Sequence, residues 1–232
     1  MSDRPLRCYN YRKKGKIMNI VVLISGRGSN LRAIAEAFRS GKIKGRISLV
    51  ISNKKDAPGL DVARGYGIKG EFIDPKGFQG REEYDRYLID RINMENPDLV
   101  VLAGYMRILS DAFIEAFEGK LINIHPSLIP AFKGLHAQRQ AVEFGVRFSG
   151  CTVHYVTKDL DAGPVIVQAV VPVNPDDTEQ SLSEKILSYE HRIYPQAIKW
   201  ISEGRVKING RTVVVEGARY NSLPVNPELE DF

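Results

Sequence analysis

The sequence predicts an α/β protein with an open, mostly parallel twisted sheet and helices on both of its faces. Two features of the chain support this fold class. Short apolar runs rich in β-branched residues, which are typical of buried parallel strands, recur through the first half. Segments with apolar residues at helical spacing separate these runs. Alternation of strand and helix builds βαβ units, whose strands are parallel and whose crossovers are right-handed.

The first half of the chain supplies most of the predicted sheet. Strands are expected at the apolar runs of residues 19–24, 47–51, 69–73 and 99–103. Helices are expected at residues 31–40, 59–66 and 81–93. We expect Asn30 or Ser29 to cap the first helix, and Gly41 to end it, because these residue types favour those positions.

The second half has a different rhythm. Pro126 stops a short apolar run at residues 121–124, and a loop containing proline and glycine follows at residues 126–134. Further strands are expected at residues 151–156 and 165–173, and helices at residues 137–144 and 178–200. Pro195 should kink or interrupt the longer helix, because proline lacks the backbone N–H. Asn209-Gly210 predicts a hairpin between residues 207–208 and 212–215.

The charge of the chain is concentrated at its start. The 232 residues carry 33 basic and 28 acidic side chains, a formal net charge of +5. Six of the basic residues and a single acid lie within residues 1–18, so the remainder is neutral. We therefore divide the chain into a basic, irregular leader (1–17), one domain (18–223) and an acidic tail (224–232) that we expect to be irregular.

Composition excludes several classes of protein. With 43% hydrophobic and 26% charged residues the chain is typical of a soluble globular protein. Its apolar runs are too short for a membrane helix, and the leader lacks the apolar core of a secretory signal. Two cysteines do not make a disulfide framework, so we expect a cytoplasmic protein without a membrane partner. The four histidines lack zinc-site spacing, so we expect no metal.

A glycine loop, residues 25–30, lies between the first predicted strand and helix. It does not match a dinucleotide site, because Leu31 replaces the third glycine and no acid follows the second strand. It does not match a Walker loop either, because no Gly-Lys-Ser/Thr follows. The remaining candidate ligand is a small anion such as a monophosphate, which Gly28, Ser29 and Asn30 would hold. The alternative is that the glycines only permit a tight turn.

Asn123 and His125 are the most informative polar residues. Residues two apart on a strand point to the same face, and Pro126 places both at the carboxyl edge of the sheet, where ligands bind. An amide beside an imidazole can stabilise an oxyanion and move a proton in acyl transfer. The alternative is a structural histidine.

The roles of three further polar residues are considered next to this pair. Asp161 either forms a turn or returns to the sheet edge to orient His125. His154 is either a second site histidine or part of the core. Cys151 has apolar neighbours and no G-x-S-x-G motif occurs, so the nucleophile should come from the substrate.

Three stretches together resemble the phosphoribosylglycinamide formyltransferase family: residues 19–30, residues 123–130 with Gly134, and residues 161–164. The resemblance runs from about Met18 to Trp200. It implies a Rossmann-like formyltransferase fold and transfer of the formyl group of 10-formyltetrahydrofolate to the amine of 5-phosphoribosylglycinamide. The products would be formylglycinamide ribonucleotide and tetrahydrofolate, in de novo purine biosynthesis. The implied partners are these small molecules, with 10-formyltetrahydrofolate as co-substrate and no nucleic acid.

The resemblance also implies roles for individual residues. His125 is the general acid, Asn123 helps to hold the formyl oxygen, and Asp161 supports the histidine. The nucleotide substrate is bound by Gly28, Ser29 and Asn30 at its phosphate and by Glu190 at its glycinamide group. The folate side is formed by Arg81, Met106, Arg107, Ile108, Leu109 and Asn123. Two residues depart from the family: Ala162 replaces a frequent glycine, and Leu187 stands where a polar residue near the phosphate is common.

The sequence also allows three alternative functions. A formyltetrahydrofolate hydrolase usually has a histidine where this chain has Pro126, and an N-terminal regulatory domain. A tRNA formyltransferase has an additional C-terminal domain. A non-catalytic nucleotide-binding protein is disfavoured by the neutral body of the chain, which lacks interleaved basic and aromatic residues. The oligomeric state stays open, and a homodimer is one candidate.

Overall fold

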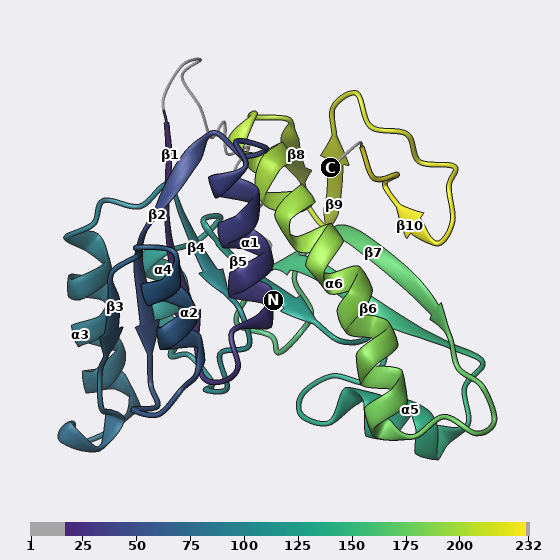
Figure 1. The fold of residues 1–232 in the computed structure, drawn as a ribbon, viewed down its shortest axis with the longest axis horizontal. Coiled ribbons are helices and arrows are strands. Elements are labelled where there is room, and N and C mark those ends of the chain that lie inside the picture. Colours follow the sequence, from purple (N-terminus) through teal and green to yellow (C-terminus); the bar gives the residue numbers. More distant parts are fainter. Residues whose placement is uncertain (1–16, 231–232) are drawn as a thin grey trace. The chain divides into compact units, whose positions relative to one another are not determined.

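The computed structural model describes residues 17–230, which form two compact units, residues 17–123 and residues 124–230. The predicted leader therefore lies almost entirely outside the described residues, as does the end of the predicted acidic tail. Each unit has its own sheet segments and helices (Figure 1).

The first unit contains five parallel strands. They are β1 (Met18–Ile24), β2 (Gly45–Ser52), β3 (Gly70–Phe72), β4 (Leu99–Leu102) and β5 (Leu121–His125), of which the part up to Asn123 belongs to this unit. Their order is β5-β4-β1-β2-β3. Every residue of β1, the central strand, is buried, as the continuous apolar run predicted. This arrangement confirms the predicted α/β fold class.

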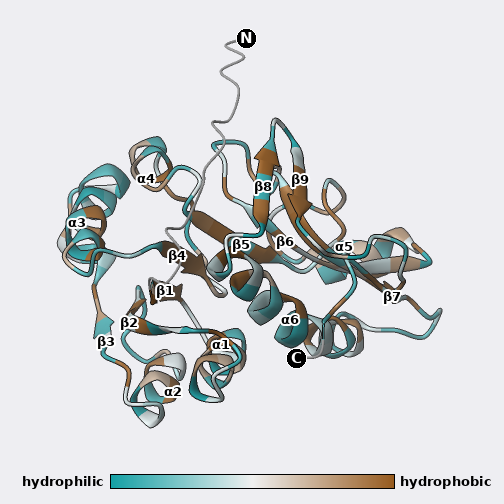
Figure 2. Ribbon diagram, turned by 90° about the horizontal axis from the view of Figure 1, so that it is seen from above, coloured by the Kyte–Doolittle hydropathy of each residue, from teal (hydrophilic) through white to brown (hydrophobic). Residues whose placement is uncertain are grey.

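Helices cover both faces of these parallel strands. They are α1 (Ser29–Arg39), α2 (Gly59–Gly65), α3 (Arg81–Asn93) and α4 (Asp111–Ala116), with a short 3-10 helix, η1 (Pro75–Gly77). Figure 2 shows α1 and α2 on one side of the strands and α3 and α4 on the other. The helices α4 and η1 were not predicted from the sequence, because such short helices show no full period of apolar spacing.

The start of α1 differs from the expectation. Neither Asn30 nor Ser29 caps it; the capping position is held by Gly28 in the left-handed conformation, with φ of 74°, and no side chain caps the helix. The close approach of α2 explains this, because a Cβ on Gly28 would lie 2.6 Å from the Cα of Gly59. The last residue of the helix is Arg39 and its C-cap is Ser40. Gly41 follows in the left-handed conformation, with φ of 76°, and so ends the helix as expected.

The second unit is built around antiparallel strands. Its elements are α5 (Ala137–Phe144), β6 (Phe148–Tyr155), β7 (Val165–Pro172), α6 (Glu179–Ser202), β8 (Val206–Asn209), β9 (Thr212–Val215) and β10 (Val225–Asn226). The strands β10, β7 and β6 are neighbours in that order, and β8 and β9 form the predicted hairpin. The tail was expected to be irregular, but two of its residues, Val225 and Asn226, pair with Ala169 and Gln168 of β7.

Helix α6 packs on β6 and β7 and forms the core of the second unit. It begins with a reciprocal capping box, in which Thr178 and Ser181 each accept a hydrogen bond from the other's backbone N–H. The helix runs through Pro195 without the interruption considered above. Every residue from Ile193 to Ile198 is buried, and this packing outweighs the one hydrogen bond that proline cannot donate. Within the described residues, no helix is long and apolar enough to cross a membrane.

Candidate active site

The glycine loop follows β1 in the first unit. Its position is fixed by α2, because the N–H of Gly59 donates to the carbonyl of Gly26 at 3.0 Å. Ser29 and Asn30, which the sequence predicted as anion ligands, form the first turn of α1. The first amides of a helix lack partners within the helix, and Gly28, at the capping position, has no side chain to bond to them. The loop and the start of α1 therefore form a backbone cradle suited to a small anion.

The predicted folate-binding segment follows β4 in the same unit. Met106 and Ile108 are exposed, at 62% and 68% of their surface, whereas Tyr105 and Leu109 are buried. The guanidinium of Arg107 lies 4.8 Å from the ring centre of Tyr84, and its Nε is buried without a hydrogen-bond partner. Apolar side chains at the surface beside an arginine with an unused donor suit a flat, anionic ligand.

Arg81, the other predicted folate residue, is the first residue of α3. Its side chain is half exposed and lies 3.4 Å from Glu82. An exposed ion pair of this kind contributes little to stability, so the arginine remains available to a ligand.

Strand β5 carries Asn123 and His125, as the sequence predicted. Asn123 is half-buried and pairs in register with Leu102 of β4, so the end of β5 lies beside the end of β4. His125 is buried in the second unit. The strand ends there, and Pro126 opens the loop that follows.

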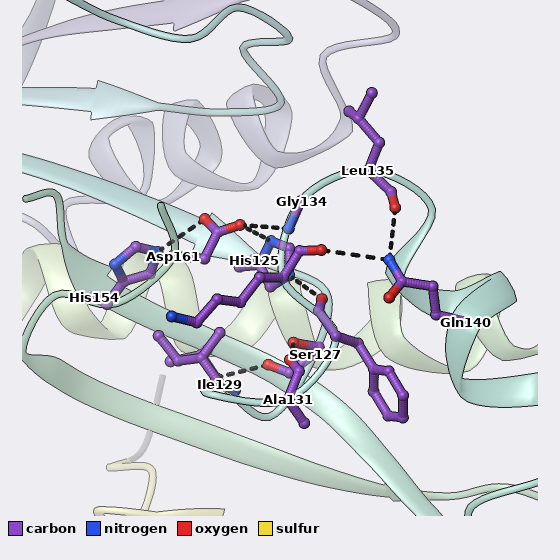
Figure 3. Close-up of polar contacts among 12 residues, drawn as sticks. His125, Ser127, Ile129, Ala131, Gly134, Leu135, Gln140, His154 and Asp161 are labelled. Atoms are coloured by element: carbon purple, nitrogen blue, oxygen red, sulfur yellow. Dashed lines mark hydrogen bonds and ion pairs between the residues drawn. The ribbon is translucent and has the colours of Figure 1, made fainter. Parts of the chain in front are cut away.

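The structure brings Asp161 to His125. The Nδ1 atom of His125 lies 3.4 Å from Oδ2 of Asp161, and its Nε2 lies 2.8 Å from the carbonyl oxygen of Phe132. A carbonyl only accepts, so Nε2 carries a hydrogen, while Nδ1 faces a carboxylate. Both ring nitrogens thus face acceptors, and each donates a hydrogen bond when it carries a proton. The N–H of Gly134 donates to the same Oδ2 at 2.8 Å and fixes the carboxylate (Figure 3).

His154 lies on the other side of Asp161 (Figure 3). Its Nδ1 donates to the carbonyl of Tyr155 at 2.9 Å, and its Nε2 lies 3.8 Å from Oδ1 of Asp161. Burial lowers the pKa of His154, and this outweighs the opposing effects of the Tyr155 carbonyl and of Asp161. The sequence left open whether His154 belongs to the site or to the core, and the structure shows a buried ring next to Asp161. The spacing of the residues along the sequence gave no signal for this contact.

Glu190 is a buried acid on α6 in the second unit. Burial, and after it the charge of Glu190, raises the pKa of the Cys151 thiol well above its ordinary value. A buried thiol of this kind is inert, so Cys151 is not suited to act as a nucleophile. Within residues 17–230, no group of three or more histidine, cysteine or acidic side chains is arranged to hold a metal ion.

Comparison with protein families and curated proteins gives consistent relatives. Residues 18–198 match the family model described as formyl transferase. The chain is 51% identical over 202 residues to the phosphoribosylglycinamide formyltransferase of Escherichia coli (strain K12), covering 87% of this chain and 95% of that protein. It is 44% identical over 198 residues to the trifunctional purine biosynthetic protein adenosine-3 of Homo sapiens, covering 84% of this chain but 20% of that longer protein.

Solved structures give the same result. The fold is similar to glycinamide ribonucleotide transformylase 1 from Symbiobacterium toebii, with a TM-score of 0.85 and 49% identity, over 87% of this chain and 95% of that one. It is also similar to the phosphoribosylglycinamide formyltransferase from Anaplasma phagocytophilum, with a TM-score of 0.81 and 45% identity over the same shares of the two chains. Both similarities extend over nearly the whole of the solved chains.

Proposed function

The chain belongs to the formyl transferase family, and from this premise we propose that it converts 5-phosphoribosylglycinamide to formylglycinamide ribonucleotide in de novo purine biosynthesis. The formyl donor is 10-formyltetrahydrofolate, and the second product is tetrahydrofolate. The observation that carries this assignment is the similarity to a phosphoribosylglycinamide formyltransferase over 95% of that protein, at 51% identity. The enzyme is thus a folate-dependent formyltransferase that needs no metal for the steps below.

In the proposed mechanism, the substrate amine attacks the formyl carbon and the carbonyl electrons move to the oxygen. Asn123 and the protonated His125 stabilise this oxyanion by donating hydrogen bonds. For this, Nε2 of His125 exchanges the carbonyl oxygen of Phe132 for the oxyanion. Asp161 favours the imidazolium through its carboxylate, 3.4 Å from Nδ1 of His125. When the tetrahedral species collapses, the C–N bond to the folate breaks. One proton leaves the amine, and one reaches the folate nitrogen through His125 or a water.

The remaining residues bind the two substrates in this proposal. Gly28, Ser29 and Asn30 hold the phosphate, which their position at the start of α1 supports. Glu190 contacts the glycinamide group. The folate is held by a set that combines exposed apolar side chains with two arginines: Arg81, Met106, Arg107, Ile108 and Leu109, with Asn123 at the formyl end.

We further propose that the enzyme works in the cytoplasm, where both small-molecule substrates would be soluble, without a membrane or nucleic-acid partner. A homodimer is the assembly that we would test against a monomer. Light scattering coupled to size-exclusion chromatography distinguishes the two states by mass.

A single assay tests the function. The full chain is incubated with 10-formyltetrahydrofolate, with and without 5-phosphoribosylglycinamide, and the release of tetrahydrofolate is followed together with the formation of the formylated nucleotide. Release that depends on the amine substrate is expected. Release without the amine would instead indicate a hydrolase, and no release in either mixture would indicate a binding protein.

A further inference from the structure

A buried hydroxyl links the two predicted substrate-binding segments of the first unit. We propose that Ser25 is a positioning residue that ties the phosphate loop to the folate-binding segment and holds the backbone of Met106 for folate binding. The proposal rests on the proposed function. Ser25 is the first residue of the glycine loop and is not among the residues assigned above to phosphate or folate binding.

The parallel sheet brings three chain segments together at this point. Strand β1 lies between β2 and β4, with Ile24 opposite Ser52 and Leu23 opposite Leu102. The residues that follow these strands therefore leave the sheet at one edge. Ser25 follows β1, Asn53 follows β2, and the segment that leads to Met106 follows β4.

The hydroxyl of Ser25 bonds to both neighbouring segments. The backbone N–H of Met106 donates to its oxygen at 2.8 Å. The hydroxyl hydrogen is then donated to Oδ1 of Asn53 at 2.6 Å. The Ser25 backbone N–H also donates to the carbonyl of Gly104, at 3.1 Å, so backbone and side chain bind the same segment. Ser25 is only 4% exposed, and these bonds are therefore shielded from competing water.

The glycine loop and the folate-binding segment are each held by a further contact that does not involve Ser25. The glycine loop is fixed by the bond from Gly59 to Gly26. The folate-binding segment is fixed by Tyr105, whose hydroxyl lies 3.4 Å from that of Tyr84, beneath the guanidinium of Arg107. Ser25 joins the two segments between these anchors. Its loss should leave both anchors in place but free the Met106 amide to move.

This arrangement predicts a specific kinetic effect. The side chains of Met106 and Ile108 are exposed, so they do not define a fixed binding geometry. The backbone of this segment is the part that can bind a folate in a fixed geometry. Ser25→Ala removes the acceptor of the Met106 N–H, so the segment samples other positions and binding weakens. The reacting groups on β5 do not depend on this bond. The KM for 10-formyltetrahydrofolate should rise, and kcat should change much less.

The experiment compares Ser25→Ala with a matched control, Ser149→Ala. Ser149 is equally buried, but its hydroxyl has no hydrogen-bond partner, so its removal deletes the same atom without breaking a bond. We expect Ser25→Ala to raise the KM for 10-formyltetrahydrofolate about tenfold, with kcat within about threefold of the wild type. Ser149→Ala should leave both constants unchanged.

A second pair of variants keeps the test valid if Ser25→Ala does not fold. Asn53→Ala removes the acceptor of the Ser25 hydroxyl, whereas Asn53→Asp keeps an oxygen there. Asn53→Ala should raise the KM, and Asn53→Asp should restore it. An unchanged KM in Ser25→Ala, or in Asn53→Ala where only that variant folds, would overturn the proposal. An equal rise in Ser149→Ala would do the same.

Failure of the proposed function would be seen separately, as a wild-type chain without transfer activity. The role of Ser25 is then tested by measuring the affinity of the wild type and of each variant for tetrahydrofolate by calorimetric titration. Weaker binding to Ser25→Ala than to the wild type and Ser149→Ala supports it. Equal affinities, or no binding by any of the three chains, overturn it.

Discussion

Asp161 carries more contacts than its position in a surface loop suggests. Its carboxylate accepts from Gly134 and lies between His125 and His154. Its backbone is in the left-handed region, with φ of 43°, which aspartate tolerates better than most residues. Loop backbone and side-chain contacts therefore both determine where the charge lies relative to His125.

The first prediction tests this pair. His125→Ala and Asp161→Asn should each lower kcat at least ~100-fold, because the first removes the proton donor and the second removes the charge that favours the imidazolium. Asp161→Asn keeps an oxygen for the Gly134 N–H, so the loop should stay in place. Steady-state formyl transfer is the measurement, and Asp159→Asn, an exposed acid of the same loop, is the control. Rates near those of the wild type in both variants would refute the assignment.

The second prediction concerns His154 and acid stability. Burial holds its pKa below the ordinary 6.5, so below that pH the unfolded chain binds a proton that the native chain does not. The free energy of unfolding should therefore fall as the pH falls through this window. His191, which is half-buried, adds a contribution of the same sign, because burial lowers its pKa as well.

Urea unfolding measures this at about pH 7.5 and about pH 5.5. His154→Gln removes one titrating group, so its free energy of unfolding should fall less between the two pH values, by up to about 1 kcal/mol. The comparison uses the change with pH within each chain, so any constant loss from the substitution cancels. Equal losses in variant and wild type would show that His154 is not held neutral.

At the scale of elements, strong periodicity predicted the structure well. Helices α3 and α5 begin and end at the predicted residues, and β1 and β7 differ by a residue at one end. Elements set by tertiary contacts were missed or misplaced. Strand β10 exists because it pairs with β7, and α1 starts at Ser29 because Gly28 packs against Gly59. Neither contact leaves a local pattern in the sequence.

The third prediction isolates this close approach. Gly28→Ala would place a Cβ 2.6 Å from the Gly59 Cα in a left-handed backbone, whereas Gly67→Ala has a similar φ of 68° with open space around it. Gly67→Ala should cost about 1–2 kcal/mol of stability for the backbone alone. Gly28→Ala should cost more, and it should also raise the KM for the nucleotide at least ~10-fold by displacing the phosphate loop. Urea unfolding and steady-state kinetics measure the two effects. Equal stability losses would mean that the approach of α2 does not constrain the loop.

For the whole molecule, the sequence predicted the fold class and which residue types form the site, but not their contacts. The pair Asn123 and His125 could be predicted because strand geometry relates residues two apart. The approach of Asp161 to His125 depends on how the loop between β6 and β7 returns, which spacing does not encode. The link from Ser25 to Met106 likewise depends on β1 and β4 being neighbours in the sheet.

The last prediction concerns the charge of the whole chain. The net charge of +5 arises within residues 1–18, and every residue assigned to the site lies after them. The proposed phosphate donors are local amides and side chains of residues 28–30, and interactions between exposed charges are weakened by salt at physiological ionic strength. Deletion of residues 1–17 should therefore leave kcat and both KM values within about twofold of the full chain. The two chains should also respond alike to added salt. A larger loss of activity, or a salt dependence that disappears with the deletion, would show that the basic leader contributes to the capture of the anionic substrates.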